Sequence, residues 1–500
     1  MTYWTPIAFE DIMFDSCYRK ANGGSEVFSM RAFYDMAVEI REGDNCRLSN
    51  ILNPMFTIMS PWKEIFPWLN GLLCAGIIWL IITKIAKIKY HLVITGALIW
   101  ASIVVFLPWR DLMFLTDYSL NYVFPSFLTL LFIYLVVRAD RCGWSSHLTV
   151  LIIVLATPVG AWHEGFFAAA ISGFCVWAVL HHFRLPPQWW LTMIVYTATA
   201  LIFALSPGIL QRAVREIIVQ PRELPLGMIA FDLLPCVAIV LLCGCTAISH
   251  AGRRLMRRLI GNEAFVVLFV SAVVGTLISV VVTHRPRTSF WPNLCAIATA
   301  TIYLAELVRF LGENRRRWLL RVESIAAVVS LVFCIFHGTY CLVWQHRLHL
   351  ENEYINSRIL AGDNEIYCDL LHPVSPRMLT LAFQTSHIWM NLNCFALTDS
   401  LHGRHIAVLP TALRDIRPEN TDILGGRIGV MRTGNALWTR SPAVVTDQNA
   451  SLRITLDDGS EKIINYAVAR RFPLGDGDSA TYIDIGRIDP LSVTAVDMPW

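Results

Sequence analysis

Charged residues are scarce in this chain of 500 residues. Asp, Glu, Lys and Arg account for 16% of the sequence, whereas soluble domains carry about 25%. Hydrophobic residues reach 55%, and the mean hydropathy is +0.51. Acidic and basic residues almost cancel at a formal net charge of +3, so the charge balance indicates no nucleic-acid partner. The composition predicts a protein that crosses a membrane several times.

Motifs typical of several enzyme classes are missing as well. The sequence has no GxGxxG and no P-loop, so we expect no nucleotide cofactor. Its 13 cysteines include no CxxC pair and no Cys/His cluster with metal-ligand spacing. We expect the cysteines inside apolar runs to be small core residues. Cys17, Cys46, Cys368 and Cys394 fall in segments predicted to lie outside the membrane, where the sequence leaves a disulfide open.

The chain contains a series of apolar runs instead. A helix that crosses a bilayer needs about 20 apolar residues, with a range of about 17 to 25. Ten charge-free runs of this kind recur in the first 345 residues. They lie at 66–83, 91–109, 122–137, 147–161, 165–180, 188–206, 227–249, 264–283, 289–305 and 324–345. The fourth and fifth runs nearly fuse around GAWHEGFF, so one broken hairpin is an alternative interpretation.

The Lys and Arg residues of the short loops predict the orientation. Loops after odd-numbered runs hold fifteen of them, and the alternate loops hold six. Basic loops favour the cytoplasm, so both termini are predicted to be extracytoplasmic. The sequence from Met1 has neither the positive nor the apolar region of a signal peptide. We therefore expect a first helix upstream of Met1, and the alternative is a short translocated tail.

The last 155 residues have a different pattern. They are polar, with short alternating runs such as EIYCDLL and LRITLDDGSEKIINYAV, and DDG at Asp457 to Gly459 is typical of a hairpin turn. The predicted fold class is an α-helical polytopic membrane protein with about ten transmembrane helices. Its predicted parts are an extracytoplasmic N-terminal loop at 1–65, a transmembrane domain at 66–345 and a small, mainly β extracytoplasmic C-terminal domain at 346–500.

Four polar clusters are predicted on the extracytoplasmic side, at or near helix ends. Charges at membrane depth are costly and tend to face one another or a polar cavity, so their shared side suggests a site. Glu10 and Asp11 in FEDIMF are followed by Asp44, Arg47 and Asn50; the other clusters are Asp111, Asp117 and Asn121, then His163 and Glu164, and finally His284, Arg285 and Arg287.

Each cluster also has a simpler interpretation. Residues near helix ends are often solvated or act as interfacial anchors. Glu164 could cap the helix that begins there. The Arg-Pro-Arg turn at Arg285 and Arg287 suits a phosphate, and a turn that binds anionic headgroups would look the same.

The layout resembles the GT-C membrane glycosyltransferases, and more narrowly the bacterial multi-pass proteins related to O-antigen and surface-polysaccharide glucosyltransferases. The likeness rests on FEDIMF in the first outer loop, DNCRLSN at 44–50, the WHE hairpin at Trp162 to Glu164, the RPR turn and IWMNLNCFAL at 388–397. It covers most of the chain in layout. The sequence departs from the family pattern with Glu10 at the first acidic position and with Asn45-Cys46 where the relatives have glycine.

The resemblance implies a reaction and roles for these residues. A sugar would pass from a polyprenyl-phosphate donor to a glycan or lipid-linked acceptor at the outer face of a bacterial inner membrane. Asp11, beside Glu10, would be the general base for the acceptor hydroxyl. Cations would hold the departing phosphate, and Glu164 and His163 would orient the acceptor or the base. The phosphate-binding candidates are Arg285, Arg287, His284 and Arg47. The sequence leaves a divalent metal open.

Other classes of function remain open on the sequence. A transporter or flippase would place ionisable residues near mid-bilayer in broken helices, and Asp232 is the only acid within the predicted runs. A polysaccharide polymerase or ligase for cell-envelope glycans would share the topology and the basic outer loops. A non-catalytic scaffold would scatter the polar clusters over its surface.

Overall fold

The computed structural model describes most of the first 363 residues and a set of strands after them. The described residues are 10–43, 47–88, 92–107, 116–214, 226–280, 286–363, 365–368, 407–410, 422–424, 428–433, 436–441, 451–465, 469–473, 479–484 and 492–497. The chain divides into two compact units. The described residues of Met13–Trp344 form what we call the helical unit, and those of Gln345–Trp500 belong to the strand unit.

Three short helices occupy the N-terminal segment that the sequence analysis treated as a loop: α1 (Glu10–Ala21), α2 (Met30–Gly43) and α3 (Leu48–Thr57). The buried residues of α2, Ala32, Phe33, Met36 and Ile40, recur at helical spacing. Tyr18 of α1 packs on Phe33 with ring centroids 4.9 Å apart. The segment therefore folds around a small apolar core of its own.

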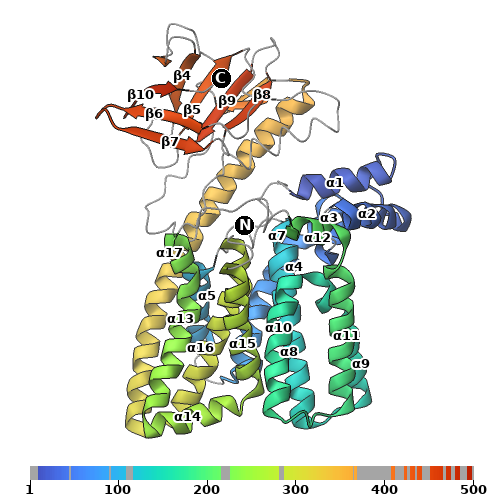
Figure 1. The fold of residues 1–500 in the computed structure, drawn as a ribbon, viewed down its shortest axis with the longest axis vertical. Helices are drawn as coiled ribbons and strands as arrows, with labels where there is room; N and C mark the ends of the chain where they lie inside the picture. Colours follow the sequence, from blue (N-terminus) through green and yellow to red (C-terminus); the bar gives the residue numbers. More distant parts are fainter. Residues whose placement is uncertain are drawn as a thin grey trace. The chain divides into compact units, whose positions relative to one another are not determined.

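The helical unit continues with long helices joined by shorter ones, and its last helix extends beyond Trp344 into the strand unit (Figure 1). They are α4 (Trp62–Trp79), the π-helix η2 (Leu80–Ile85), α5 (Leu92–Phe106), α7 (Thr116–Tyr118), the π-helix η3 (Ser119–Val123), α8 (Phe124–Cys142), α9 (Ser146–Trp162), α10 (Glu164–Leu180), α11 (Pro187–Ala204), α12 (Pro207–Val214), α13 (Leu226–Ile248), α14 (His250–Ile260), α15 (Glu263–Ile278), the 3-10 helix η6 (Pro286–Ser289), α16 (Phe290–Phe310) and α17 (Glu313–Leu360).

The described residues of the ten predicted apolar runs lie almost entirely on helices, and several of these helices suit a membrane. In the described chain, four are long and apolar enough to cross one: Trp62–Ile85, Thr116–Cys142, Phe290–Phe310 and Glu313–Thr339. A fifth candidate is the pair α14 and α15, which bends by 94°. α9 and α10 are apolar but shorter, because the chain breaks between them at His163. The count of ten spans stays a prediction.

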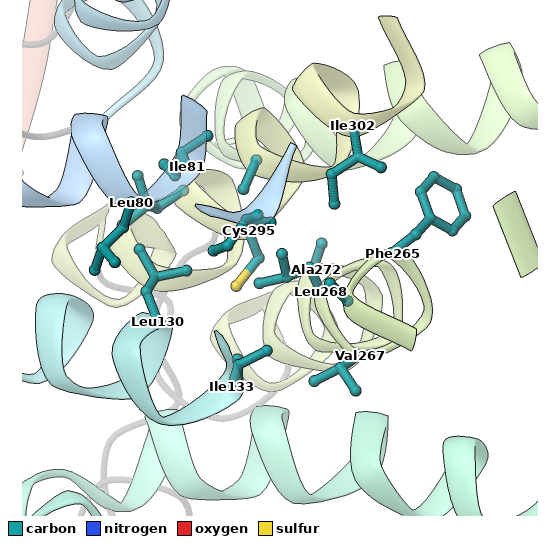
Figure 2. Close-up of a cluster of buried hydrophobic side chains, with 14 of the residues drawn as sticks. Leu80, Ile81, Leu130, Ile133, Phe265, Val267, Leu268, Ala272, Cys295 and Ile302 are labelled. Carbon is teal, nitrogen blue, oxygen red and sulfur yellow. The ribbon is translucent and has the colours of Figure 1, made fainter. Parts of the chain in front are cut away.

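The core of the helical unit lies where η2, α8, α15 and α16 meet (Figure 2). Leu80, Leu130, Leu268 and Cys295, one from each element, are at most 1% exposed. Cys236 and Cys243 are also buried, as predicted, whereas the prediction is wrong for Cys175 and Cys245, which are exposed on the outer faces of their helices.

Glycine allows the closest approach between two of these helices. A Cβ built on Gly173 of α10 would lie 2.5 Å from the backbone oxygen of Val267 in α15. Only a residue without a side chain fits such a contact, and small residues are the usual means by which membrane helices pack closely. Gly173 is therefore the position of closest approach in the pairing of α10 with α15.

The strands all follow α17 and form three small sheets. They are β1 (Glu365–Cys368), β2 (Ala407–Pro410), β3 (Asp422–Leu424), β4 (Ile428–Thr433), β5 (Ala436–Ser441), β6 (Ser451–Leu456), β7 (Glu461–Asn465), β8 (Ala469–Pro473), β9 (Ser479–Asp484) and β10 (Val493–Asp497). β1 and β2 are parallel, and the antiparallel sheets have the orders β10-β6-β7 and β3-β4-β5-β9-β8.

Two boundaries test the sequence patterns directly. The hairpin turn at Asp457 to Gly459 is confirmed, because β6 and β7 pair antiparallel on either side of it and Gly459 has φ +76. By contrast, α17 continues to Leu360, beyond the run predicted to end at 345. Its last turns are polar and contain neither glycine nor proline, and Gly362, with φ +95, follows the end of the helix.

Candidate functional site

Arg47 and Glu164 form a two-point ion pair at one end of the helical unit. Arg47 directly precedes α3 in an extended conformation, and its side chain does not cap that helix. Its Nε donates to Glu164 Oε2 over 2.8 Å, and its Nη2 donates to Oε1. The side chains are only 17% and 32% exposed. Because two bonds fix the plane of the guanidinium, its orientation is set in a way that a lysine amine would not reproduce.

His163 separates α9 from α10. Its backbone is extended, with φ −158 and ψ 120. The imidazole Nδ1 accepts from the backbone N–H of Gly165 over 3.1 Å and so caps α10. An Nδ1 that accepts carries no proton, so the neutral ring is protonated on Nε2. The cap is therefore His163 rather than Glu164, which the sequence had offered as the simpler explanation of this pair.

Trp162 fixes the same break from the other side. Its indole Nε1 donates to the backbone oxygen of Leu120 in η3 over 2.5 Å, and the side chain is buried. The ring also stacks on Phe124 at a centroid distance of 6.0 Å. The end of α9 is thus tied to the π-helical turn that precedes α8.

A buried network of amides, a carboxylate and a hydroxyl surrounds Asn121 of η3. Its Nδ2 donates to Asp117 Oδ1 over 2.8 Å and to Asn50 Oδ1 over 3.1 Å. Its Oδ1 accepts from Ser49 Oγ over 2.7 Å. All four side chains are at most 3% exposed. Since buried polar groups are costly unless they are bonded, this network specifies how α3 sits against η3.

Two further buried hydrogen bonds link η3 to α4 and α3 to α1. Ser119 Oγ donates to Asn70 Oδ1 of α4 over 2.6 Å. Asp15 of α1 is 6% exposed and accepts from Thr57 Oγ1 at the end of α3. Asn70, Ser119 and Asp15 are not among the site residues predicted from the sequence. The sequence feature that could have identified them is the recurrence of short polar residues, such as the serine and asparagines of LSNILN, on helices that otherwise carry apolar side chains.

Aromatic rings connect His163 with the start of α16. The imidazole lies 5.5 Å from the Tyr122 ring and 5.0 Å from the Phe166 ring, between centroids. Phe166 stacks on Trp291 at 4.7 Å, and Tyr122 meets Phe290 edge to face at 6.0 Å. Phe290 is the first residue of α16 and directly follows η6, so the end of η6 lies beside these rings.

The structure brings together three of the eight predicted site residues: Arg47, His163 and Glu164. Asn50, predicted in the first polar cluster, shares one hydrogen-bond network with Asp117 and Asn121, which were predicted in the second. Glu10 and Asp11 lie in the first turn of α1, and Arg287 lies in η6, but their side chains are outside the described residues, as are His284 and Arg285 entirely. The segments at Asp44, Asp111 and 388–397 are also outside them.

Within the described ranges, no group of three or more His, Cys, Asp or Glu side chains could hold a metal ion. The arrangement offers a fixed guanidinium, a carboxylate, an imidazole and buried amides. Such groups can bind an anion and orient a hydroxyl. No family model, no curated protein and no solved structure matches this chain.

Proposed function

We propose that the protein is a membrane glycosyltransferase that moves a sugar from a polyprenyl-phosphate donor to a glycan or lipid-linked acceptor. The observation that carries the proposal is the Arg47–Glu164 pair, which joins two of the predicted polar clusters at a break between apolar helices. A guanidinium held in a fixed plane suits a phosphate, and the carboxylate beside it suits a hydroxyl group.

In this proposal the donor phosphate competes with Glu164 for Arg47. Glu164 keeps the guanidinium in place while the site is empty of donor, and binding of the phosphate frees the Glu164 carboxylate to orient the acceptor hydroxyl. Asp11 is the general base that takes the hydroxyl proton as the sugar is transferred. Arg285, Arg287 and His284 add positive charge for the departing phosphate. His163 holds the start of α10, and with it Glu164, through its cap on Gly165.

The proposal includes a topology. Ten helices span a bacterial inner membrane, the site faces the extracytoplasmic side, and both ends of the sequence lie on that side. The strand unit then forms an extracytoplasmic domain. The alternating distribution of Lys and Arg along the loops supports this orientation.

The test is a transfer assay in membrane vesicles with radiolabelled polyprenyl-phosphate sugars. The variants are Asp11→Asn, Glu164→Gln and Arg47→Lys, compared at equal protein levels. We expect wild type to move label into lipid-linked or polymeric glycan, and each variant to lose at least about tenfold in rate, which is the scale of one lost electrostatic or proton-transfer contact.

The matched control is Glu263→Gln. Glu263 also pairs with an arginine, Arg141, and is similarly shielded from solvent, but it lies at the start of α15. This control should keep the transfer rate of wild type. An equal loss in Glu263→Gln and Glu164→Gln would show that the loss comes from weakened folding, and no transfer by wild type would remove the glycosyltransferase proposal.

One observation favours the alternative function, a transporter or flippase. Glu323 lies in α17 inside a candidate membrane span and is 7% exposed. Its Oε1 accepts from Thr95 Oγ1 of α5 over 3.1 Å. His337, 2% exposed, lies further along the same helix. Ionisable residues within a span are expensive and often mark the path of an ion or substrate.

The variant Glu323→Gln distinguishes the transferase from the flippase. A transferase that works at the Arg47–Glu164 pair should be insensitive to Glu323→Gln, which keeps the size of the side chain and the oxygen that accepts from Thr95. A flippase should lose movement of a fluorescent lipid-linked sugar across vesicles in the same variant. Loss of lipid movement in Glu323→Gln, with no sugar transfer by wild type, would replace the proposal by the alternative.

A further inference from the structure

Helix α14 lies across one end of the helical unit, where α13, α15 and α16 also end (Figure 1). The chain turns by 94° between α14 and α15. At the other end of α14, Ser249 is the N-cap, and its Oγ accepts from the backbone N–H of Gly252 over 2.9 Å. The N-cap and the bend thus define where α14 begins and ends.

The helix has one buried face and one strongly basic face. Leu255, Leu259 and Gly252 are buried against the helical unit. A Cβ on Gly252 would lie 1.8 Å from the backbone oxygen of Thr246, so only glycine permits this approach. The opposite face exposes four arginines at helical spacing: Arg253, Arg254, Arg257 and Arg258. The close packing of the apolar face prevents the helix from turning its arginines inward.

These arginines differ from those on the adjacent elements. Arg141 and Arg309 pair with Glu263 and Glu306, respectively. The α14 sequence HAGRRLMRRLI contains no acidic residue, and in the described parts of the chain none of its four arginines has a carboxylate within 4.0 Å. The contact found for them is that of Arg258 over the Phe310 ring, at 5.3 Å from the centroid. The face therefore carries concentrated positive charge that no carboxylate among the described residues neutralises.

The residues around α14 indicate what neutralises this positive charge. Ile248, directly before the cap, is 79% exposed, and Leu241, two turns earlier on α13, is 60% exposed. At the other end, Ile260 is 49% exposed. An apolar surface that reaches to both ends of a basic helix is typical of the boundary between lipid tails and headgroups. Arg315 and Arg316 of α17, also exposed, follow Phe310 by a few residues and extend the same basic region.

We propose that the basic face of α14 is a binding surface for the headgroups of anionic phospholipids. Arginine forks bind phosphate oxygens at two points, and the i, i+4 pairs Arg253/Arg257 and Arg254/Arg258 present two such rows in the plane of the headgroups. This inference does not depend on the reaction at Arg47 and Glu164, because it requires only a membrane with anionic lipid on that side.

The test uses the full chain in nanodiscs that contain a photoreactive phosphatidylglycerol or phosphatidylcholine at a low mole fraction. Labelled peptides are mapped by mass spectrometry. We expect phosphatidylglycerol to label α14 and its flanks, and phosphatidylcholine to label them far less. In R257Q/R258Q the phosphatidylglycerol label should fall at least about fivefold, since each basic residue near an anionic surface contributes about that factor to binding. R257K/R258K should retain most of it.

The matched control is R31Q/R41Q, which removes two exposed arginines of α2 and leaves α14 intact. It should label like wild type, and unchanged thermal unfolding shows that each variant is folded. Equal labelling by the two lipids, or an unchanged label in R257Q/R258Q, would overturn the proposal. So would full protection by excess inorganic phosphate or by an acidic peptide, which would assign the surface to a free anion or to a protein partner.

Discussion

Arg47 and Glu164 lie 117 positions apart in the chain and meet through two hydrogen bonds beside the break between α9 and α10. A second long-range pair, Arg141 with Glu263, spans 122 positions. The first pair lies beside the start of α8 and the second at its end, about 30 Å away at 1.5 Å per residue. The Arg141–Glu263 pair can therefore serve as the control in experiments on Arg47 and Glu164.

The strength of the Arg47–Glu164 pair can be measured with a double-mutant cycle. Removing one partner leaves a largely buried charge without its counter-charge, which costs more than removing both. We expect Arg47→Met and Glu164→Met each to lower the free energy of unfolding. The double variant should lose less than the sum, with a coupling of about 1 to 3 kcal/mol. Denaturant unfolding in detergent micelles measures all four proteins, and additive losses would show that the pair is not coupled.

The contact between α10 and α15 at Gly173 should not tolerate a methyl group. Gly173→Ala forces the backbone of Val267 away, and overpacking of this kind costs about 1 to 3 kcal/mol. Gly244→Ala on α13 is the matched substitution, because a Cβ there meets nothing within 4 Å. It should be neutral or stabilise the helix by up to about 1 kcal/mol. Thermal unfolding compares the two; similar shifts would mean that α10 and α15 are less closely packed than described.

Trp162→Phe tests the tie between α9 and η3. The substitution removes the indole donor and leaves the backbone oxygen of Leu120 buried without this bond, while an aromatic ring remains to stack on Phe124. The expected cost is about 1 to 3 kcal/mol. Hydrogen exchange should become faster in η3 and at the end of α9, and nowhere else. Trp190→Phe, on the partly exposed face of α11, should leave exchange unchanged.

Deprotonation of Tyr18 should lower the stability of the N-terminal helices at high pH. Burial raises the pKa of its phenol above the usual 10.0. The hydroxyl donates to the Val27 oxygen over 2.7 Å and accepts from the Ser29 N–H over 2.9 Å. Since the folded pKa is raised, the folded state holds its proton longer than the unfolded state. The stabilisation is therefore complete below pH 10 and falls as the pH rises through the folded pKa.

The corresponding measurement is the ultraviolet absorbance of tyrosinate alongside unfolding between about pH 9 and 12, a range set by the ordinary tyrosine pKa. Wild type should lose stability across this range more steeply than Tyr18→Phe, which lacks the titrating group and costs about 1 kcal/mol at neutral pH. Parallel pH curves for the two proteins would contradict the assignment.

Much of the helical unit follows from the sequence, because apolar runs of 15 or more residues have few alternatives to a helix. Where the structure describes them, the ten predicted runs lie almost entirely on helices, and the turn at Gly459 follows from its residue type. The helices α1 to α3 were not predicted, because all three are short and the first two are polar on average, although Ala32, Phe33, Met36 and Ile40 recur at helical spacing. The full length of α17 was missed because its polar turns do not look like a membrane span.

The candidate site is predictable only in part. The chain positions of Arg47, His163 and Glu164 identify them as polar residues at helix ends. The sequence does not show that Arg47 pairs with Glu164, since this depends on how α3 folds against η3 and α9. The hydrogen-bond network around Asn121 could not be predicted from the sequence for the same reason. Its members come from helices 71 positions apart, and no local pattern relates them.

The π-helical turn η3 has a consequence for how this protein can change its length. Ser119, Leu120, Asn121, Tyr122 and Val123 are consecutive and all buried. A π turn contains one residue more than an α turn, and it is usually read as a single-residue insertion in a helix. Because a π turn absorbs its extra residue within the turn, deleting Tyr122 should restore a regular α-helix and leave the faces of the flanking segments in place. Asn121, which bonds both Asp117 and Asn50, stays in the chain in this deletion. The π turn is therefore a position where the chain can lose a residue without rotating one helix against the other, whereas the same deletion within the regular part of α8 would rotate what precedes it by about 100°.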